Sequence, residues 1–188
     1  MSKVVVLGAG QWGSTLAQVL CDAGNHVLIW GRNQEVVDEI NNKHTNAHYL
    51  GENALPLGLK ATTDIKEAFE YSTIYVMAVP AQTLRENLKI WKPYVQPGAI
   101  YISSLKGIEV STLSRMTEII HEVMETDNVA IITGPNLANE LILRQPAGAV
   151  AAAATNVLAE KVQKLFATPY YRVYTPVDVL GCELAGSI

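Results

Sequence analysis

The sequence is poor in cysteine and shows no spacing typical of a metal site. Its 188 residues include two cysteines, Cys21 and Cys182, which lie far apart and form no Cys-x-x-Cys pair. This spacing excludes a disulfide scaffold and a structural zinc site, and it favours two packed, reduced thiols in a reducing compartment. The four histidines are scattered without metal spacing, so we expect no bound metal.

Positive charge and long apolar runs are scarce as well. Lys and Arg number 14 against 18 Asp and Glu, which gives a net charge of −4, and the basic residues form no run. Nucleic acid is therefore excluded as a partner, whereas a small anion in a local pocket stays open. The small-residue run at Ala147–Ala154 is far shorter than the roughly 20 residues of a membrane-spanning helix. We expect a cytoplasmic protein with neither a membrane span nor a signal peptide.

What the sequence does contain is a regular alternation of two patterns. Short apolar runs predict strands at Lys3–Leu7, His26–Trp30, Leu59–Thr62, Ile74–Ala78, Ala99–Ser103, Val129–Ile132, Ala147–Ala153 and Arg172–Tyr174. The stretches between them predict helices at Trp12–Ala23, Gln34–Asn42, Asp64–Tyr71, Ala81–Trp91, Ser111–Glu125, Asn136–Leu143 and Thr155–Phe166. This order predicts an α/β protein with a doubly wound, mostly parallel sheet and flanking helices.

Local signals predict where several of these helices begin and end. Gly24-Asn25 is expected to end the first helix, and Asp64 and Ser111 are expected N-caps. Residues 44–58, which hold several Asn, Gly and Pro residues, predict an irregular surface loop near the ligand. From Pro176 onward the pattern is that of a further helix, with Asp178 near its start.

Three glycines connect the first predicted strand to the first predicted helix, within Gly8-Ala9-Gly10-Gln11-Trp12-Gly13. In this context Gly8 permits a tight turn, Gly10 lets the backbone approach a pyrophosphate, and Gly13 lets the helix lie close to the sheet. The free N–H groups and the positive end of the helix dipole then face the two phosphates. The sequence therefore predicts a Rossmann-like fold that binds a dinucleotide.

The end of the second predicted strand indicates which dinucleotide is preferred. An NAD-selective site usually places Asp or Glu there to bind the ribose hydroxyls. Here the strand ends in Trp30-Gly31-Arg32-Asn33, so a cation takes the place of the acid. A charge-assisted hydrogen bond to a 2′-phosphate would favour NADP, or at least permit it. The alternative is that Arg32 is a solvated charge at a helix start.

Three later strand ends are predicted to reach the same cleft, because ligands bind beyond the carboxyl ends of parallel strands. Pro80 follows the fourth strand and would fix the backbone beside the cofactor. Lys106 and Gly107 follow the fifth strand, where an ammonium group could hold a carbonyl oxygen or an anionic substrate. Gly134-Pro135-Asn136 follows the sixth strand, and Asn136 is expected to cap the next helix.

The same residues, in the same order, resemble bacterial NAD(P)-dependent glycerol-3-phosphate dehydrogenases. The resemblance covers essentially the whole chain, and its Lys-Gly-Ile-Glu and Glu-Leu-Ala-Gly motifs are more specific than the glycine pattern. It is carried by the glycine motif, Trp30-Gly31-Arg32-Asn33, His48-Tyr49-Leu50, Ala78-Val79-Pro80, Ser104-Leu105-Lys106-Gly107-Ile108-Glu109, Gly134-Pro135-Asn136 and Glu183-Leu184-Ala185-Gly186.

This resemblance implies an oxidoreductase that interconverts dihydroxyacetone phosphate and sn-glycerol 3-phosphate with NADP or NAD, supplying glycerophospholipid synthesis. Lys106 is the catalytic candidate, because an alkoxide formed by hydride transfer needs positive charge and a proton nearby. Substrate contacts are expected from Lys106, Gly134 and Asn136. The residues expected to bind the cofactor are Gly8, Gly10, Gln11, Trp12, Gly13, Arg32, Asn33, Tyr49, Pro80, Lys106 and Ala138.

The sequence departs from the family pattern in two places. Asn136 stands where Ser or Thr is more usual and Leu137 where an aromatic residue is common, which leaves the fine substrate contacts open. In addition, the Glu183 motif continues in the family to a lysine that acts as acid and base, and this sequence stops before it. We expect residues 1–176 to form the dinucleotide-binding domain and 177–188 to begin an all-helical substrate domain. We expect this chain to bind NADPH weakly without turnover, and the complete protein to be a homodimer.

Two rival interpretations stay open. The first is another dehydrogenase with a glycine-rich N-terminal fold, such as a ketopantoate reductase or a 3-hydroxyacid dehydrogenase, although the stretch from Lys106 to Glu109 argues against it. The second is a non-catalytic sensor of NAD(P)H. Such a sensor would not need a lysine in its cleft.

Overall fold

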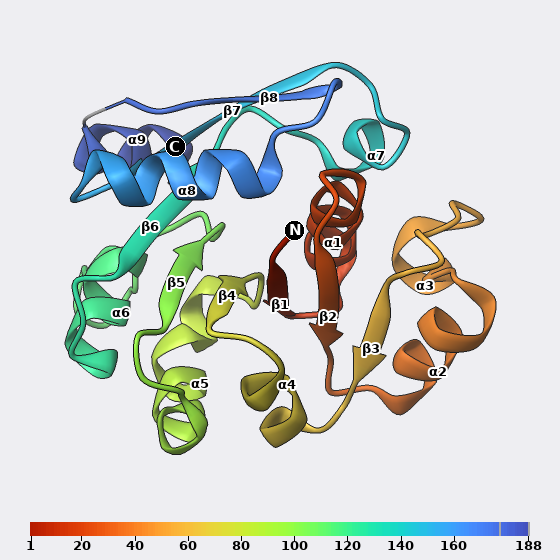
Figure 1. Ribbon diagram of the computed structural model, residues 1–188. Coiled ribbons are helices and arrows are strands. Elements are labelled where there is room, and N and C mark those ends of the chain that lie inside the picture. Colours follow the sequence, from red (N-terminus) through yellow and green to blue (C-terminus); the bar gives the residue numbers. More distant parts are fainter. Residues whose placement is uncertain (177, 188) are drawn as a thin grey trace.

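A single twisted sheet forms the centre of the computed structural model, which describes residues 1–176 and 178–187 (Figure 1). The strand order is β3-β2-β1-β4-β5-β6-β7-β8, and neighbouring strands run parallel except β6 and β7, which are antiparallel. The strands are β1 (Lys3–Leu7), β2 (His26–Trp30), β3 (Lys60–Thr62), β4 (Ile74–Met77), β5 (Ile100–Ser103), β6 (Val129–Thr133), β7 (Ala147–Ala153) and β8 (Tyr171–Tyr174).

Helices connect the strands and cover both faces of the sheet. The α-helices are α1 (Gln11–Asp22), α2 (Gln34–Lys43), α3 (Ala47–Leu50), α4 (Ile65–Tyr71), α5 (Leu84–Trp91), α6 (Met116–Met124), α7 (Ala138–Leu141), α8 (Asn156–Phe166) and α9 (Val179–Ser187). Two short 3₁₀ turns, η1 (Ala81–Thr83) and η2 (Lys92–Tyr94), flank α5. In the described part of the chain, no helix is both long and apolar enough to cross a membrane.

Alternate residues of the central strands β1, β2, β4 and β5 enter two separate cores. In β1, Val4 and Val6 pack in the core that includes α1, α2 and α8, whereas Val5 and Leu7 pack in the core that includes α4, α5 and α6. Both faces of these strands are therefore buried, which explains why they are almost continuously apolar, whereas the edge strand β8 alternates between buried and exposed residues. Figure 1 shows α4, α5 and α6 grouped on one side of the sheet.

This architecture confirms the predicted Rossmann-like, doubly wound α/β fold. In the described sheet β7 and β8 are parallel to each other and run opposite to the other strands. Asp64 is the N-cap of α4, since its carboxylate accepts hydrogen bonds from the N–H groups of Lys66 and Glu67. Gly24 follows α1 with a φ of +86°, as expected for a glycine that ends a helix. Asp178 precedes α9, and its carboxylate accepts a hydrogen bond from the Gly181 N–H.

Two predicted N-caps are wrong. Helix α6 begins at Met116 and its N-cap is Arg115, because residues 108–115 form a turn closed by an isolated bridge between Ile108 and Arg115. Ser111 therefore lies in the turn. Helix α7 has Leu137 as N-cap, since the Asn136 side chain instead donates to the Tyr171 hydroxyl at 3.3 Å.

The segment predicted to be an irregular loop, residues 44–58, is more ordered than expected. It contains α3 and an isolated bridge between Thr45 and Ala54. Asn46 is fully buried, and its side-chain NH₂ donates to the Ala9 carbonyl oxygen at 3.0 Å and to Ser14 Oγ at 2.8 Å. These bonds hold the segment against the glycine turn. The predicted second domain begins at residue 177 and ends at residue 188. Both of these residues lie outside the described residues.

Candidate functional site

A pocket of about 780 Å³ lies at the carboxyl ends of β1, β2, β4 and β5. This is the place where ligands bind in open α/β sheets, at the point where the strand order reverses. Here the order reverses between the neighbouring strands β1 and β4, and the loops that follow these two strands both line the pocket. The predicted residues that line it are Gly8, Gly10, Gln11, Trp12, Arg32, Asn33, Tyr49, Pro80, Lys106 and Asn136.

The three glycines of the first turn have three different surroundings. Gly8 has a φ of +129°, and a Cβ there would lie 2.4 Å from the Ala78 carbonyl oxygen. A Cβ on Gly13 would lie 1.8 Å from the Gly8 carbonyl oxygen, so Gly13 sits beneath the pocket and permits close packing of α1 on the sheet. A Cβ on Gly10 would meet no atom within 4 Å, because Gly10 faces the open pocket.

The first turn of α1 points its positive end at this pocket. Gly10 is the N-cap and has no side chain to occupy the free N–H groups of the helix start, and the first turn contains no acidic residue. The site is therefore suited to an anion that supplies its own oxygen acceptors.

The end of β2 supplies the one arginine among the pocket-lining residues, Arg32, which is exposed. The structure records no ion pair for it with any described residue. Asn33 has a structural task as well, because its side-chain oxygen accepts a hydrogen bond from the Glu35 N–H at 2.8 Å and so caps α2. Tyr49 is 41% exposed at the pocket wall.

Lys106 lies where this pocket meets a second one of about 770 Å³, because it lines both. The second pocket is walled by the end of β6, the first half of β7 and one side of α9. Gly134 lines this second pocket, whereas Asn136 lines the first. A Cβ on Gly134 would lie 2.7 Å from both Asn136 Nδ2 and the Gly148 carbonyl oxygen, which keeps this turn compact.

Not every predicted residue reaches a pocket. Ala138 lines neither of the two, although the neighbouring Asn139 accepts a hydrogen bond from Gln11 Nε2 at 2.8 Å. The sequence did not predict several other residues that line the two pockets. They contribute backbone or small side chains, which have no chemical signature of binding. They include Ala9, Val36, Ala81 and Ser104 in the first pocket and Thr133, Cys182 and Ala185 in the second.

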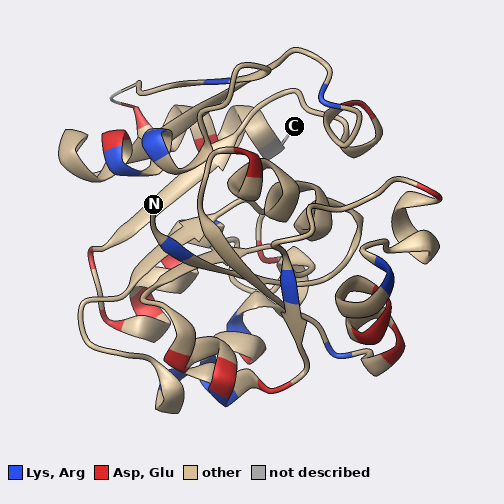
Figure 2. Ribbon diagram, turned by 45° about the vertical axis from the view of Figure 1, so that its right-hand side comes forward, with Lys and Arg blue, Asp and Glu red and all other residues tan. Residues whose placement is uncertain are grey.

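Charged groups elsewhere are dispersed. Figure 2 shows Lys and Arg spread over the ribbon among Asp and Glu, without a continuous basic face. The described residues include no group of three or more His, Cys, Asp or Glu side chains that could hold a metal ion. Cys21 and Cys182 are both free, and burial is the main reason why the pKa of each thiol is raised, to about 12 for Cys21.

Comparison with known proteins gives a consistent family. A family model described as the N-terminus of NAD-dependent glycerol-3-phosphate dehydrogenase matches residues 3–159. Proteins named glycerol-3-phosphate dehydrogenase (NAD(P)+) from Corynebacterium urealyticum and Thermobifida fusca are each 47% identical to this chain over 100% of it and 57% of their own length. The chain thus spans just over half of these relatives.

A solved structure agrees in three dimensions. The crystal structure of glycerol-3-phosphate dehydrogenase from Coxiella burnetii superposes with a TM-score of 0.90 at 28% identity, and the match covers 98% of this chain and 57% of that one.

Proposed function

Because the chain belongs to the NAD-dependent glycerol-3-phosphate dehydrogenase family, we propose that it is the nucleotide-binding part of an oxidoreductase that uses NADP or NAD. The reaction proposed for the complete protein is hydride transfer between dihydroxyacetone phosphate and sn-glycerol 3-phosphate, which supplies glycerophospholipid synthesis. The observation that carries the proposal is that Gly10, Arg32 and Lys106 line one pocket at the carboxyl edge of the sheet.

The residues of the pocket fit a dinucleotide at three points. The open side of Gly10 and the start of α1 suit the pyrophosphate, with Gln11 and Trp12 beside it. Arg32, Asn33 and Tyr49 lie where the adenosine ribose would be held, and Arg32 supplies a cation for a 2′-phosphate on that ribose. Pro80 and Lys106 border the opposite part of the pocket, which would take the nicotinamide. Gly8 and Gly13 shape the turn, and Ala138 lies beyond it.

Lys106 has the chemistry that the reaction requires. When bound, the nicotinamide supplies or accepts the hydride. The Lys106 ammonium can hold the carbonyl oxygen of the substrate and stabilise the negative charge that develops on it. Gly134 and Asn136 flank this position from the turn after β6, and the second pocket offers room for a small phosphorylated substrate next to Lys106.

We extend the proposal to the organisation of the protein. Residues 1–176 would form the nucleotide domain and 177–188 the beginning of a helical substrate domain, which suits the lining of the second pocket by α9. A cytoplasmic location and a homodimer of the complete protein stay predictions. The two free cysteines suit a reducing compartment.

The test of the nucleotide site is a fluorescence titration of the chain with NADPH and NADH. Arg32→Ala should weaken NADPH binding about tenfold, because it removes a charge-assisted hydrogen bond, while NADH binding changes little. Lys43→Ala, which alters an exposed cation at the far end of α2, is the control. An equal loss for both nucleotides would contradict the role of Arg32, and no binding of either would contradict the nucleotide site.

The test of the reaction uses the complete protein. It should oxidise sn-glycerol 3-phosphate in preference to short 2- and 3-hydroxy acids, and Lys106→Ala should lower kcat/KM by about 100-fold or more, as expected for the loss of a charged group at the reacting oxygen. Unchanged activity in Lys106→Ala would favour another substrate or a sensor.

A further inference from the structure

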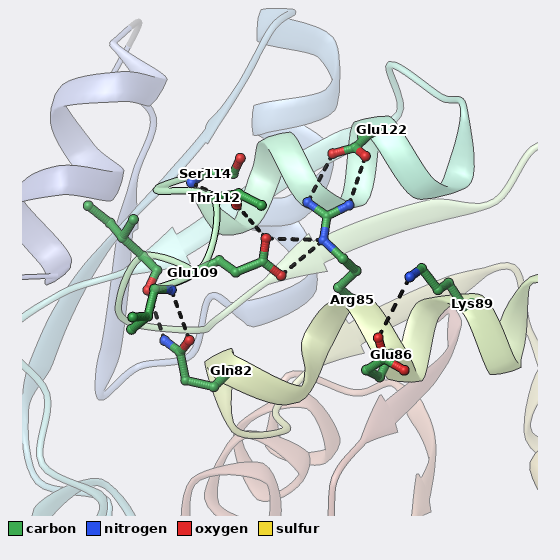
Figure 3. Close-up of polar contacts among 10 residues, drawn as sticks. Gln82, Arg85, Glu86, Lys89, Glu109, Thr112, Ser114 and Glu122 are labelled. Carbon is green, nitrogen blue, oxygen red and sulfur yellow. Dashed lines mark hydrogen bonds and ion pairs between the residues drawn. The ribbon is translucent and has the colours of Figure 1, made fainter.

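The loop that carries Lys106 is held in place by side chains from the neighbouring strand-to-helix turn. This loop, residues 104–115, connects β5 to α6 and is not part of the sheet ladder. Two of its residues have positive φ, +121° at Gly107 and +60° at Leu113, so its backbone adopts a conformation that needs support. The support comes from Gln82 in η1 and Arg85 in α5, two and five residues after Pro80 (Figure 3).

Gln82 fixes the backbone on both sides of Glu109, one and three residues beyond Gly107. Its side-chain NH₂ donates to the Ile108 carbonyl oxygen at 2.8 Å, and its side-chain oxygen accepts from the Val110 N–H at 3.0 Å. One amide therefore binds the loop at two points, as a paired strand would.

Glu109 anchors the same part of the loop from its buried side. Its side chain is 7% exposed, and both carboxylate oxygens accept from Arg85 Nε, at 2.9 and 3.0 Å. The Thr112 hydroxyl donates to it as well, and the Glu109 N–H donates to the Ser114 carbonyl oxygen at 2.9 Å. The bonds from Arg85 and Thr112 lower the pKa of Glu109, so it is ionised at neutral pH.

Arg85 has a second carboxylate partner, which lies outside the loop. Its two terminal nitrogens donate to Glu122 on α6 at 2.8 and 2.9 Å (Figure 3). A buried ion pair is costly to desolvate and is weak evidence for stability, so a network of this kind is better explained by the single geometry that it imposes.

The far end of the loop is fixed in a similar way. Arg115 donates to Glu183 on α9 at 2.8 Å, and Glu183 also accepts from the Thr117 N–H at 2.9 Å. The segment between Lys106 and α6 is thus anchored both to the Pro80 turn and to α9.

We propose that Gln82, Arg85 and Glu109 are positioning residues for Lys106. They join the Pro80 turn and the Lys106 loop into one body, so that the backbone that carries the exposed Lys106 side chain keeps a fixed place beside the two pockets. The ligand that Lys106 meets there is the one of the proposed function, on which this inference rests. The anchoring itself can be tested without any ligand.

The first experiment measures amide hydrogen exchange of residues 107–115 in the chain without ligand. Glu109→Ala should speed exchange about tenfold or more, because the loop opens locally when its anchor is lost. Glu122→Ala is the matched control, since it removes the other carboxylate held by the same arginine but leaves the loop contacts intact. Equal exchange in the two variants would overturn the proposal.

A second variant covers the case in which Glu109→Ala does not fold. Gln82 is exposed, so Gln82→Ala cannot leave a core defect, yet it removes two anchors of the loop. It should also speed exchange at residues 107–115, by severalfold. Unchanged exchange in Gln82→Ala would overturn its part in the anchoring.

The second experiment asks whether Glu109 acts through Lys106. NADPH affinity is measured for Lys106→Ala, Glu109→Ala and the double variant. We expect each single variant to lose about fivefold and the double variant to lose no more, since residues that act through one another are not additive. Losses that multiply would overturn the positioning role. Failure of the unaltered chain to bind NADPH would contradict the proposed function instead, and the exchange experiment would still decide the anchoring.

Discussion

Two glycines of the first turn should respond in opposite ways to the same substitution. In Gly13→Ala the new methyl group would lie 1.8 Å from the Gly8 carbonyl oxygen, a backbone atom that cannot move aside without shifting the turn. We expect this variant to lose roughly 2–3 kcal/mol of unfolding free energy, as overpacked sites do. Urea denaturation followed by circular dichroism measures the loss.

Gly10→Ala should instead affect ligand binding more than stability. No atom lies within 4 Å of the added methyl group, and Gly10 has φ −79° and ψ −172°, which alanine adopts readily. We expect its unfolding free energy to stay within about 1 kcal/mol of the original while NADPH affinity falls at least tenfold, because the methyl group would occupy the place proposed for the pyrophosphate. Unaltered affinity would contradict the assignment of the phosphate site.

Acid sensitivity should be traceable in part to Glu109. Its pKa in the folded chain lies below the ordinary value of 4.5, chiefly because of Arg85. The ionised carboxylate therefore stabilises the fold fully above pH 4.5, and this contribution is lost as the pH falls through the lower, folded-state pKa. Glu109→Gln should flatten the fall of unfolding free energy between pH 5 and pH 3. Curves that run parallel for the two proteins would contradict this.

At the scale of the element, helix α4 depends on its cap. The Asp64 carboxylate accepts from two N–H groups of the first turn, so Asp64→Ala should cost about 1 kcal/mol of unfolding free energy. Ser111→Ala is a useful comparison, because Ser111 has the sequence signature of a cap but lies in the turn before α6. It should change stability by less than about 0.5 kcal/mol in the same denaturation experiment. Equal losses would mean that the cap bonds of Asp64 do not matter.

The elements that could be predicted from the sequence are those whose signals are local. The glycine turn, the Asp64 cap and the apolar strands depend on neighbouring residues, and the structure has them where the sequence indicates. The wrong caps depend on distant contacts: Asn136 binds Tyr171, and the turn around Ser111 is held through Glu109 by Arg85. The reversed direction of β7 could not be predicted either, because a run of small apolar residues such as Ala147–Ala153 predicts a strand but not its direction in the sheet.

The candidate site could be predicted where its residues belong to a recognisable motif or carry a charge. Gly10, Arg32 and Lys106 come from three separate turns, and the rule that parallel strands gather their carboxyl ends at one edge was enough to bring them together. The second pocket was not predicted, since its wall comes from the packing of α9 on β6 and β7. Contacts of that kind have no periodicity or motif to reveal them.

For the whole molecule, Glu183 should decide whether α9 stays in place. Its side chain is 3% exposed and accepts from Arg115 and Thr117, while Gly186 lies against Thr133. Glu183→Ala removes the acceptor of the Thr117 N–H and hydroxyl and one of the two carboxylates paired with Arg115, which keeps Glu118 at 2.7 Å. Release of α9 limits the damage, so we expect faster hydrogen exchange and proteolysis at residues 179–187 and an almost unchanged sheet. Uniform destabilisation of the sheet would contradict this.

The position of Lys106 on the wall between two pockets has a consequence for how occupants communicate. One ammonium group carries one positive charge. An anion bound in one pocket therefore changes the electrostatic attraction that the group exerts on a ligand in the other pocket. Under the proposed function, coenzyme and reactant would occupy the two sides, so one side chain would couple their binding, and thermodynamic reciprocity would require each to change the affinity of the other by the same factor.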